Sequence, residues 1–268
     1  MTSVSLSVRD INVLEKMKDP ESDPGSGVRI DTTQPKDPNI QDSSVYDRVS
    51  QRERDIVLSM QQLELQLAGV RPRTTQDIPA EYRGRVTALD ELILEHPQYA
   101  SARNNRAQAL RRLYGDSLLV TGAHGSMALL QEVEDEERLE AGATLLSDLD
   151  RSISLLTPAT GRTALSPQAT KTLSMAHTQR AAIYHITSKA LSSCSLSVHP
   201  QRRESNWAKL EFEEAASRDF AMGGRYGNEI AKGLAVSTNP TAKLCGQIVR
   251  EAMKKEYGPE FAAWKPTL

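Results

Sequence analysis

The side chains best suited to chemistry in this sequence are a group of amides and guanidiniums between residues 100 and 116. The group consists of Asn104, Asn105, Gln108, Arg111 and Arg112. Arginine clusters are effective anchors in protein interfaces because the guanidinium fork pairs bidentately with carboxylates. The group therefore predicts a surface that receives an acidic or helical segment of a protein partner. The alternative is a solvated face on which the arginines pair with nearby acids of the same chain.

The sequence offers little support for a catalytic or metal-binding site. The histidines are scattered through the chain, at His96, His124, His177, His185 and His199. Two of them, His177 and His185, share a predicted helix but lie too far apart to hold one metal ion. An HExxH motif, a cysteine pair, a phosphate-binding loop and a nucleophile elbow are all missing. We therefore expect no catalytic residue, no metal and no cofactor, and an unrecognised enzyme is the least favoured alternative.

The composition is that of a helical protein without attraction to polyanions. Only 38% of the 268 residues are hydrophobic, so part of the chain should not pack into a core. The formal net charge of −2 and the pI near 6.2 give no pull towards nucleic acid or an anionic membrane. The two cysteines, Cys194 and Cys245, are too few for a disulfide framework and indicate free thiols in a reducing compartment.

The sequence predicts a cytoplasmic protein, with entry into the nucleus left open. The N-terminus lacks the basic region and apolar run of a secretory signal. No apolar run approaches the roughly 20 residues that a membrane span needs. We therefore expect neither a membrane nor a nucleic-acid partner.

Helical periodicity accounts for most of the chain after residue 44. It predicts helices over residues 45–69, 80–95, 100–116, from the acidic run 132–137 to 156, and over 167–191, 206–222, 228–236 and 240–257. No segment alternates as a strand does. The fold class is therefore all-α, with helices arriving in pairs and residues 258–268 forming a tail.

The helix over residues 100–116 is predicted to pack closely against its neighbours. Ala102, Asn105, Ala109 and Leu113 fall near one stripe, where small side chains let another helix approach. Gly115 ends this helix. Elsewhere, Leu149 is predicted to lie in the core.

The helix over residues 206–222 is expected to bury Trp207, Leu210, Ala215 and Phe220. The pair Gly223-Gly224 is interpreted as a helix break and not as a phosphate cradle.

Residues 1–44 form a mostly disordered arm by composition. Residues 8–18 could form a short amphipathic helix with Val8, Ile11, Leu14 and Met17 on one face, but three turns are marginal in water. Residues 19–38 are rich in Pro, Asp, Ser and Gly and cannot bury enough surface to fold alone. Two readings stay open: a tail with a transient helix, and a helix that docks on the folded body through a flexible tether.

The body of the chain resembles the tetratricopeptide repeat protein 36 family. The resemblance runs from about residue 10 to 253 and includes residues 13–14, 19–20, 100–102, 148–151, 179–181, 218–220 and 225–227. Its most specific parts are the run Asn-Asn-Arg-Ala-Gln-Ala at 104–109 and Asn-Pro-Thr-Ala-Lys-Leu-Cys at 239–245.

The resemblance implies a helical solenoid of three tetratricopeptide helix-turn-helix repeats plus a capping helix over residues 45–257. The sequence departs from this pattern in three insertions, at residues 70–79, 117–135 and 192–205. All three lie in turns, where added length costs little loop-closure entropy. The insertions leave the expected fold intact.

Some repeats of this kind hold the C-terminal tail of a chaperone with a two-carboxylate clamp. Here Asn105 occupies the position of the second-repeat asparagine, but the first repeat offers Glu64 and Ala68 in place of a lysine and an asparagine. The third repeat offers Gln179 where an arginine belongs, with Arg180 one step round the helix. The clamp is therefore incomplete, although Gln179 and Arg180 join the predicted partner-binding residues.

The sequence leads to a non-enzymatic adaptor that binds a protein or peptide in the groove of its repeats. The resemblance links the family to the regulation of tyrosine metabolism, which implies an enzyme of tyrosine catabolism as partner. The alternative is a cochaperone that binds heat-shock protein 70 through the incomplete clamp.

Overall fold

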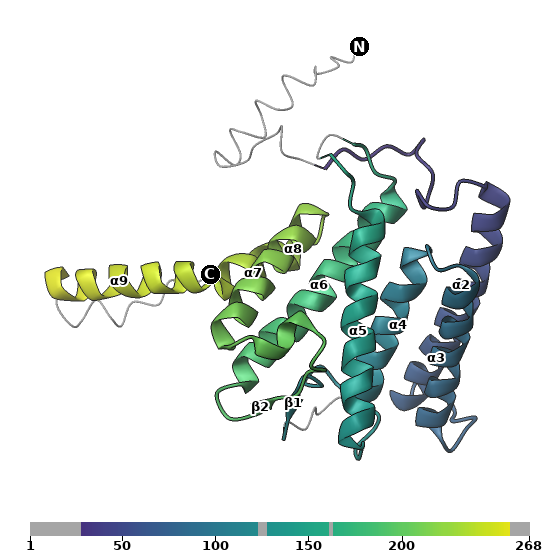
Figure 1. The fold of residues 1–268 in the computed structure, drawn as a ribbon, viewed down its shortest axis with the longest axis horizontal. Coiled ribbons are helices and arrows are strands. Elements are labelled where there is room, and N and C mark those ends of the chain that lie inside the picture. Colours follow the sequence, from purple (N-terminus) through teal and green to yellow (C-terminus); the bar gives the residue numbers. More distant parts are fainter. Residues whose placement is uncertain (1–27, 123–127, 161–162, 258–268) are drawn as a thin grey trace, which may run out of the picture.

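The computed structural model describes residues 28–122, 128–160 and 163–257, and this part of the chain is mostly helical (Figure 1). The all-α prediction is confirmed for these residues. The predicted helix over residues 8–18 and the tail at 258–268 lie outside them. The helices are α2 (Ser43–Leu67), α3 (Ile78–Glu95), α4 (Ala100–Tyr114), α5 (Asp135–Leu156), α6 (Pro167–Ala190), α7 (Lys209–Arg225), α8 (Glu229–Thr238) and α9 (Pro240–Tyr257).

Local sequence explains where these helices begin and end. The side chains of Asp42, Asp77 and Ser166 accept hydrogen bonds from backbone N–H groups in the first turns of α2, α3 and α6. Pro167 opens α6, where its missing N–H costs nothing. Gly115 ends α4 with a φ of 83°, a conformation that disfavours any residue with a Cβ.

From α2 to α8, each helix packs against the next one along the chain, and α4 also contacts α6. One continuous core joins α2 to α7, and Leu89, Leu113, Leu145 and Leu149 are fully buried or nearly so. The burial of Leu149 confirms the position predicted for it. Because α4 meets both α3 and α5 as well as α6, the helix lined with small residues lies in the middle of the stack.

Two of the sequence insertions pair with each other through a short β-ribbon. Strand β1 (Val120–Thr121) follows α4, and strand β2 (Ser195–Leu196) follows α6. They are antiparallel, with Val120 opposite Leu196, and the Ser197 N–H donates to the Leu119 carbonyl over 2.8 Å. No strand was expected here, because two-residue strands are too short to show alternation. The ribbon fixes both insertions against the helix stack.

The prediction that Gly223-Gly224 breaks a helix was wrong. Helix α7 continues through both glycines to Arg225. A Cβ at Gly224 would lie 2.8 Å from the Cα of Lys232 in α8, and one at Gly223 would lie 2.5 Å from Thr178 Oγ1 in α6. The two glycines therefore let neighbouring helices approach α7 closely.

The start of α7 also differs from the prediction, and Leu210, which was predicted to be buried, is exposed. The helix begins at Lys209, after a 3₁₀ turn over Arg203–Asn206. Trp207 precedes the helix in an extended conformation and packs against the rings of Tyr184 and Phe212. The buried face of α7 runs through Phe212, Ala216 and Phe220, and Leu210 lies on the opposite side of the helix, where it is 55% exposed.

Residues 28–42, called the strap below, run across the connection between α5 and α6. The Asp31 N–H donates to the Leu165 carbonyl over 2.9 Å, and the Leu165 N–H donates to the Arg29 carbonyl over 2.8 Å. The Ser166 hydroxyl donates to the Lys36 carbonyl, and the Asn39 amide donates to the carbonyl of Leu155. This part of the predicted N-terminal arm is therefore attached to the helix stack.

Candidate functional site

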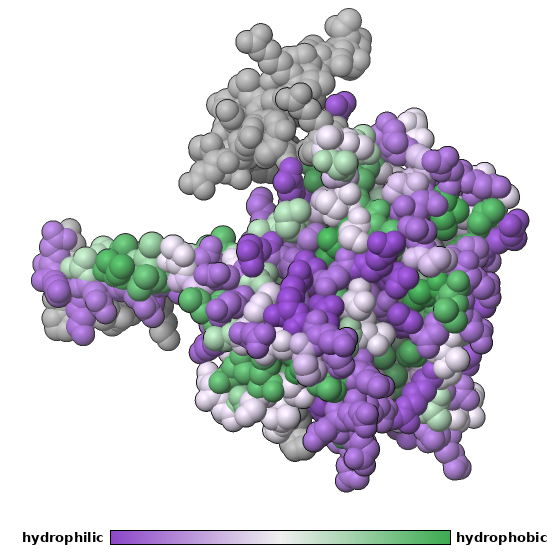
Figure 2. Space-filling model, viewed as in Figure 1, coloured by the Kyte–Doolittle hydropathy of each residue, from purple (hydrophilic) through white to green (hydrophobic). Residues whose placement is uncertain are grey.

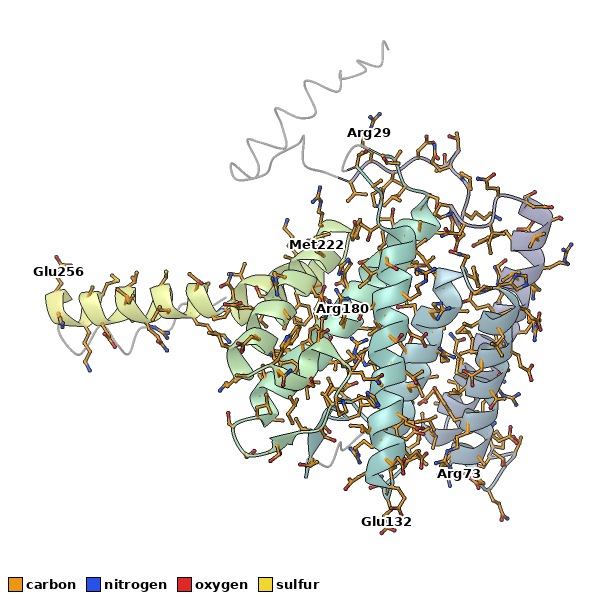
Figure 3. The ribbon with its side chains drawn as sticks, in the orientation of Figure 1. Arg29, Arg73, Glu132, Arg180, Met222 and Glu256 are labelled. Atoms are coloured by element: carbon orange, nitrogen blue, oxygen red, sulfur yellow. The ribbon has the colours of Figure 1, made fainter. Side chains whose placement is uncertain are left out.

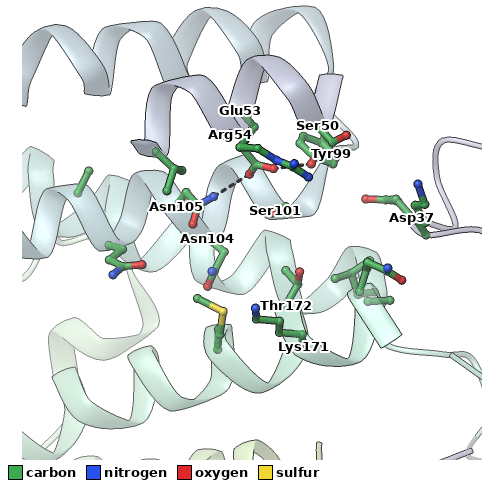
Figure 4. Close-up of a pocket in the computed structure, with 18 of the residues that line it drawn as sticks. Asp37, Ser50, Glu53, Arg54, Tyr99, Ser101, Asn104, Asn105, Lys171 and Thr172 are labelled. Atoms are coloured by element: carbon green, nitrogen blue, oxygen red, sulfur yellow. Dashed lines mark hydrogen bonds between the residues drawn. The ribbon is translucent and has the colours of Figure 1, made fainter. Parts of the chain in front are cut away.

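A groove lies between α2, α4 and α6, which share one face of the stack (Figure 4). Its volume is about 580 Å³, and the strap closes one end through Lys36 and Asp37. Each helix contributes side chains at intervals of three or four positions. The polar residues that line the groove are Ser50, Glu53, Arg54 and Gln61 from α2, Ser101, Asn104, Asn105 and Gln108 from α4, and Gln168, Lys171 and Thr172 from α6.

Glu53 is a buried carboxylate in the wall of the groove. The hydroxyl of Tyr99 donates to one carboxylate oxygen and Asn105 Nδ2 donates to the other over 2.8 Å. Burial raises the pKa of Glu53, although these hydrogen bonds oppose the shift. One N–H of Asn105, the residue at the clamp position, is therefore committed to an acid of its own chain.

Asn104, Gln179 and Arg111 form a chain of hydrogen bonds between α4 and α6. Gln179 Nε2 donates to Asn104 Oδ1 over 2.9 Å, and Arg111 Nη1 donates to Gln179 Oε1 over 3.4 Å. Arg111 also pairs with Asp116 over 2.8 Å. Asn104 and Gln179 are buried, so this chain fixes the spacing of the two helices beneath the groove.

Arg112 lies apart from the groove and pairs with Glu64 of α2 over 2.8 Å. Both partners remain partly exposed. Glu64 is the acid that stands at the first-repeat clamp position, where a lysine belongs. In the structure this carboxylate is engaged by Arg112.

Arg180 belongs to a different cluster, where α5, α6 and α7 meet (Figure 3). Its guanidinium donates two hydrogen bonds to Asp219, over 2.6 and 2.7 Å, and another to Asp150. His177 Nδ1 lies 2.8 Å from the same Asp219 carboxylate. Burial opposes ionisation of Asp219, but the bonds from Arg180 and His177 prevail and lower its pKa.

The structure thus brings some predicted partner-binding residues together and separates others. Asn104, Asn105 and Gln108 line the groove, and of these only Gln108 is exposed. Gln179 and Arg111 support the groove from beneath, whereas Arg112 and Arg180 are paired with acids elsewhere. Arg111, Arg112 and Arg180 each pair with an acid of the same chain.

Two exposed cations in the groove were missed. Arg54 lies on α2 and Lys171 on α6, on opposite sides of α4 (Figure 4). Neither makes a hydrogen bond or ion pair with another described residue. Both follow the helical spacing of the lining, since residues 50, 54, 57 and 61 and residues 168, 171, 175 and 179 each form a stripe. Extending the stripe from Gln179 back along its helix would have found Lys171.

Neither a metal cluster nor a membrane-spanning helix appears in the part of the chain that the structure describes. No group of three or more potential metal-binding side chains gathers there. None of its helices combines the length and apolar character that crossing a membrane requires.

Comparison with known proteins gives two relatives that match over most of their length. The chain is 34% identical over 255 residues to the L-tyrosine degradation gene cluster protein hmgX of Aspergillus fumigatus, covering 94% of this chain and 93% of that protein. It is 29% identical over 222 residues to tetratricopeptide repeat protein 36 of Danio rerio, covering 83% and 84%. No family model matches the chain, and no solved structure matches it significantly.

Proposed function

The chain belongs to the family of the Aspergillus fumigatus L-tyrosine degradation gene cluster protein hmgX, and we propose that it is a non-enzymatic binding protein of tyrosine catabolism. The observation that carries the proposal is the groove between α2, α4 and α6, in which unpaired cations flank a row of amides. Its partner in this proposal is an enzyme of tyrosine catabolism. The proposal includes a cytoplasmic location, where the free thiols of Cys194 and Cys245 stay reduced.

The groove suits an extended protein segment that carries acidic side chains. Arg54 and Lys171 on opposite walls provide charge-assisted hydrogen bonds to carboxylates. The exposed amide of Gln108 on α4 can donate to and accept from a peptide backbone. The acids of the groove, Glu53 and Asp37, are buried and already accept hydrogen bonds. The exposed lining therefore presents mainly positive and amide groups to a ligand.

We also propose that α2 to α7 are three tetratricopeptide repeats, capped by α8 and α9, in a chain related to tetratricopeptide repeat protein 36. Three arguments support this architecture. The helices pack in chain order, the first helix of each pair lines the groove, and the Danio rerio relative bears the repeat in its name. Solenoids of this kind use such a surface for binding.

The proposal is tested by titrating the purified chain against immobilised enzymes of tyrosine degradation, one at a time. We expect one of them to bind, with an affinity that falls as salt is added because the contacts are charged. Reversing both groove charges, with Arg54→Glu and Lys171→Glu, should weaken binding by about tenfold or more. The control variants Arg48→Glu and Arg73→Glu change exposed cations outside the groove and should bind normally.

Three results would contradict the proposal. The first is a chain that binds none of these enzymes, and the second is binding that is insensitive to the groove variants. The third is turnover of a pathway intermediate by the purified chain itself, which would make it an enzyme. A C-terminal peptide of heat-shock protein 70 is titrated in parallel. Binding that Asn105→Ala abolishes would favour the cochaperone alternative.

A further inference from the structure

Exposed apolar side chains concentrate at the C-terminal end of the helix stack. Eleven large hydrophobic residues are exposed in the described chain, and seven of them belong to α7, α8 and α9, so this end carries most of the apolar surface. The seven are Leu210, Ile230, Leu234, Val236, Leu244, Ile248 and Val249. Figure 2 shows hydrophobic residues along one side of α9.

Helix α9 extends away from the stack and is covered by no other described helix along most of its length (Figure 1). Its contacts with the body involve α8 and α7, including the pair of Lys243 with Glu213 near its first turn. Leu244 and Ile248 are four residues apart and lie on one face, with Val249 beside them. An exposed helix of this length that contains Gly246 is marginal in water. It therefore needs a partner.

The chain cannot supply that partner by folding α9 back onto α8. A single residue, Asn239, joins the two helices, and its φ of −64° and ψ of 120° are extended. Pro240 disfavours the helical conformation at the residue before it. Antiparallel helix hairpins need connections of about 2–5 residues. A cover for α9 therefore does not come from α8 of the same copy.

A complementary surface exists on α8 of the same chain. Ile230, Gly233 and Leu234 lie at positions i, i+3 and i+4 of one face, and Ile230 is 76% exposed. Nothing lies within 4 Å of the place where a Cβ on Gly233 would be. This face therefore has an open notch between two apolar side chains, into which a helix can pack.

The charges near the two surfaces add a smaller contribution. The outer half of α9 is net basic, since it carries Arg250, Lys254 and Lys255 against Glu251 and Glu256. Glu229, the first residue of α8, is exposed beside Ile230 and favours a basic helix at this face.

We infer that two copies of this chain exchange their α9 helices, each laying Leu244, Ile248 and Val249 on the Ile230–Leu234 face of the other copy. The exchange is reciprocal and closes with twofold symmetry. Helix α8 is about 15 Å long and can cover about half of α9. Two such contacts bury on the order of 1,000 Å², which reaches the lower end of the range for specific interfaces.

The test is the oligomeric state of the full chain, measured by sedimentation velocity over a range of concentrations with a reductant present. The reductant excludes a disulfide through the exposed Cys245. We expect a dimer that dissociates on dilution. Ile248→Asp on the apolar face of α9 should give a monomer, whereas Gln247→Asp, one position round the helix, should leave the dimer intact. Far-UV circular dichroism checks that both variants fold.

A variant in α8 distinguishes the exchange of α9 helices from a dimer in which the two α9 helices pack against each other. Leu234→Asp on α8 should also give a monomer. Mixing Leu234→Asp with Ile248→Asp should restore a weaker heterodimer, because one of its two contacts then has both native surfaces. A dimer that survives Leu234→Asp would overturn the exchange.

Two further outcomes would also overturn the inference. One is a chain that stays monomeric at its highest soluble concentration. The other is a monomer that floats with phosphatidylserine vesicles, which would assign the amphipathic α9 to an anionic membrane surface. None of the variants lines the groove, so failure of the exchange leaves the groove proposal untouched.

Discussion

At the scale of single residues, buried ion pairs between helices determine what the arginines do. Asp148 of α5 is 1% exposed and receives Arg106 Nε and Nη2 over 2.6 and 2.7 Å and Arg103 Nη1 over 3.2 Å. These two guanidiniums of α4 are largely buried with it. Removing one member of such a group leaves uncompensated charge in the interior.

Asp148→Ala should therefore lower the free energy of unfolding by about 3–5 kcal/mol. The exposed pair of Glu81 with Arg85 provides the comparison, and Glu81→Ala should cost less than about 1 kcal/mol. Both values come from urea denaturation followed by circular dichroism. Equal losses of unfolding free energy in the two variants would contradict the conclusion that burial makes the ion pairs of Asp148 important for stability.

Glu53 should make stability depend on pH in a direction opposite to that of Asp219. Burial raises the pKa of Glu53 above its ordinary 4.5, so the folded chain holds this proton more tightly than the unfolded chain. Its contribution to stability is therefore largest below pH 4.5 and is lost as pH rises through the folded-state pKa. The pKa of Asp219 is lowered below 3.8, so its contribution is present above pH 3.8 and is lost as pH falls through the lower value.

Glu53→Gln should accordingly remove part of the decline in stability that sets in as the pH rises above 4.5. Glutamine keeps an acceptor for Asn105 and carries no charge. The measurement is a series of urea denaturations at pH values of 4.5 and above, with the exposed Glu91→Gln as control. A Glu53→Gln profile identical to that of the unchanged chain would exclude a raised pKa.

At this scale, the residues that line the groove could be predicted from the sequence better than the residues with which charged side chains pair. It singled out Asn104, Asn105 and Gln108, which do line the groove. It could not assign Arg180 to Asp219, because 39 positions separate them and the pairing depends on how α6 meets α7. Pairing across helices is set by packing and not by local pattern. The exposed cations Arg54 and Lys171 were overlooked for another reason, because the stripes that line the groove were not followed along α2 and α6.

At the scale of elements, the periodicity of the sequence predicted which segments are helical. Some helix ends and the role of the paired glycines depended on contacts with neighbouring helices. The Pro167 start of α6 and the Gly115 end of α4 agree with local rules. Gly223-Gly224 looked like a break because glycine disfavours helices. The close approach of α8 is a tertiary contact that local propensity does not contain.

Gly224→Ala should therefore destabilise the chain by about 1–3 kcal/mol, since the added methyl group meets the backbone of Lys232. Gly233→Ala places the same group in open space within α8 and should stabilise the helix by up to about 1 kcal/mol. Thermal unfolding of the two variants, compared at low protein concentration, measures the difference. A gain in stability from Gly224→Ala would show that α8 does not approach so closely.

At the scale of the whole molecule, the continuous core from α2 to α7 should make these helices unfold together. Leu149 is fully buried in this core, and Leu149→Ala should cost about 2–5 kcal/mol. Leu94 on α3 is 80% exposed, so Leu94→Ala should change little.

Circular dichroism and the fluorescence of Trp207, with Trp264 replaced by Phe, should report coincident transitions in both variants. Separate transitions for the two signals would indicate that α2–α5 and α6–α7 unfold independently.

The strap has a consequence for how the chain is completed during synthesis. The Ser166 hydroxyl bonds to the Lys36 carbonyl across 130 positions of sequence, whereas most helix contacts join neighbours along the chain. The N-terminal helices can therefore form as they leave the ribosome, but residues 28–42 find their place only after the α5–α6 connection has been made. Until then one end of the groove stays open, so a nascent chain that has already formed α2 and α4 still lacks both the strap and α6, and its binding site is completed late.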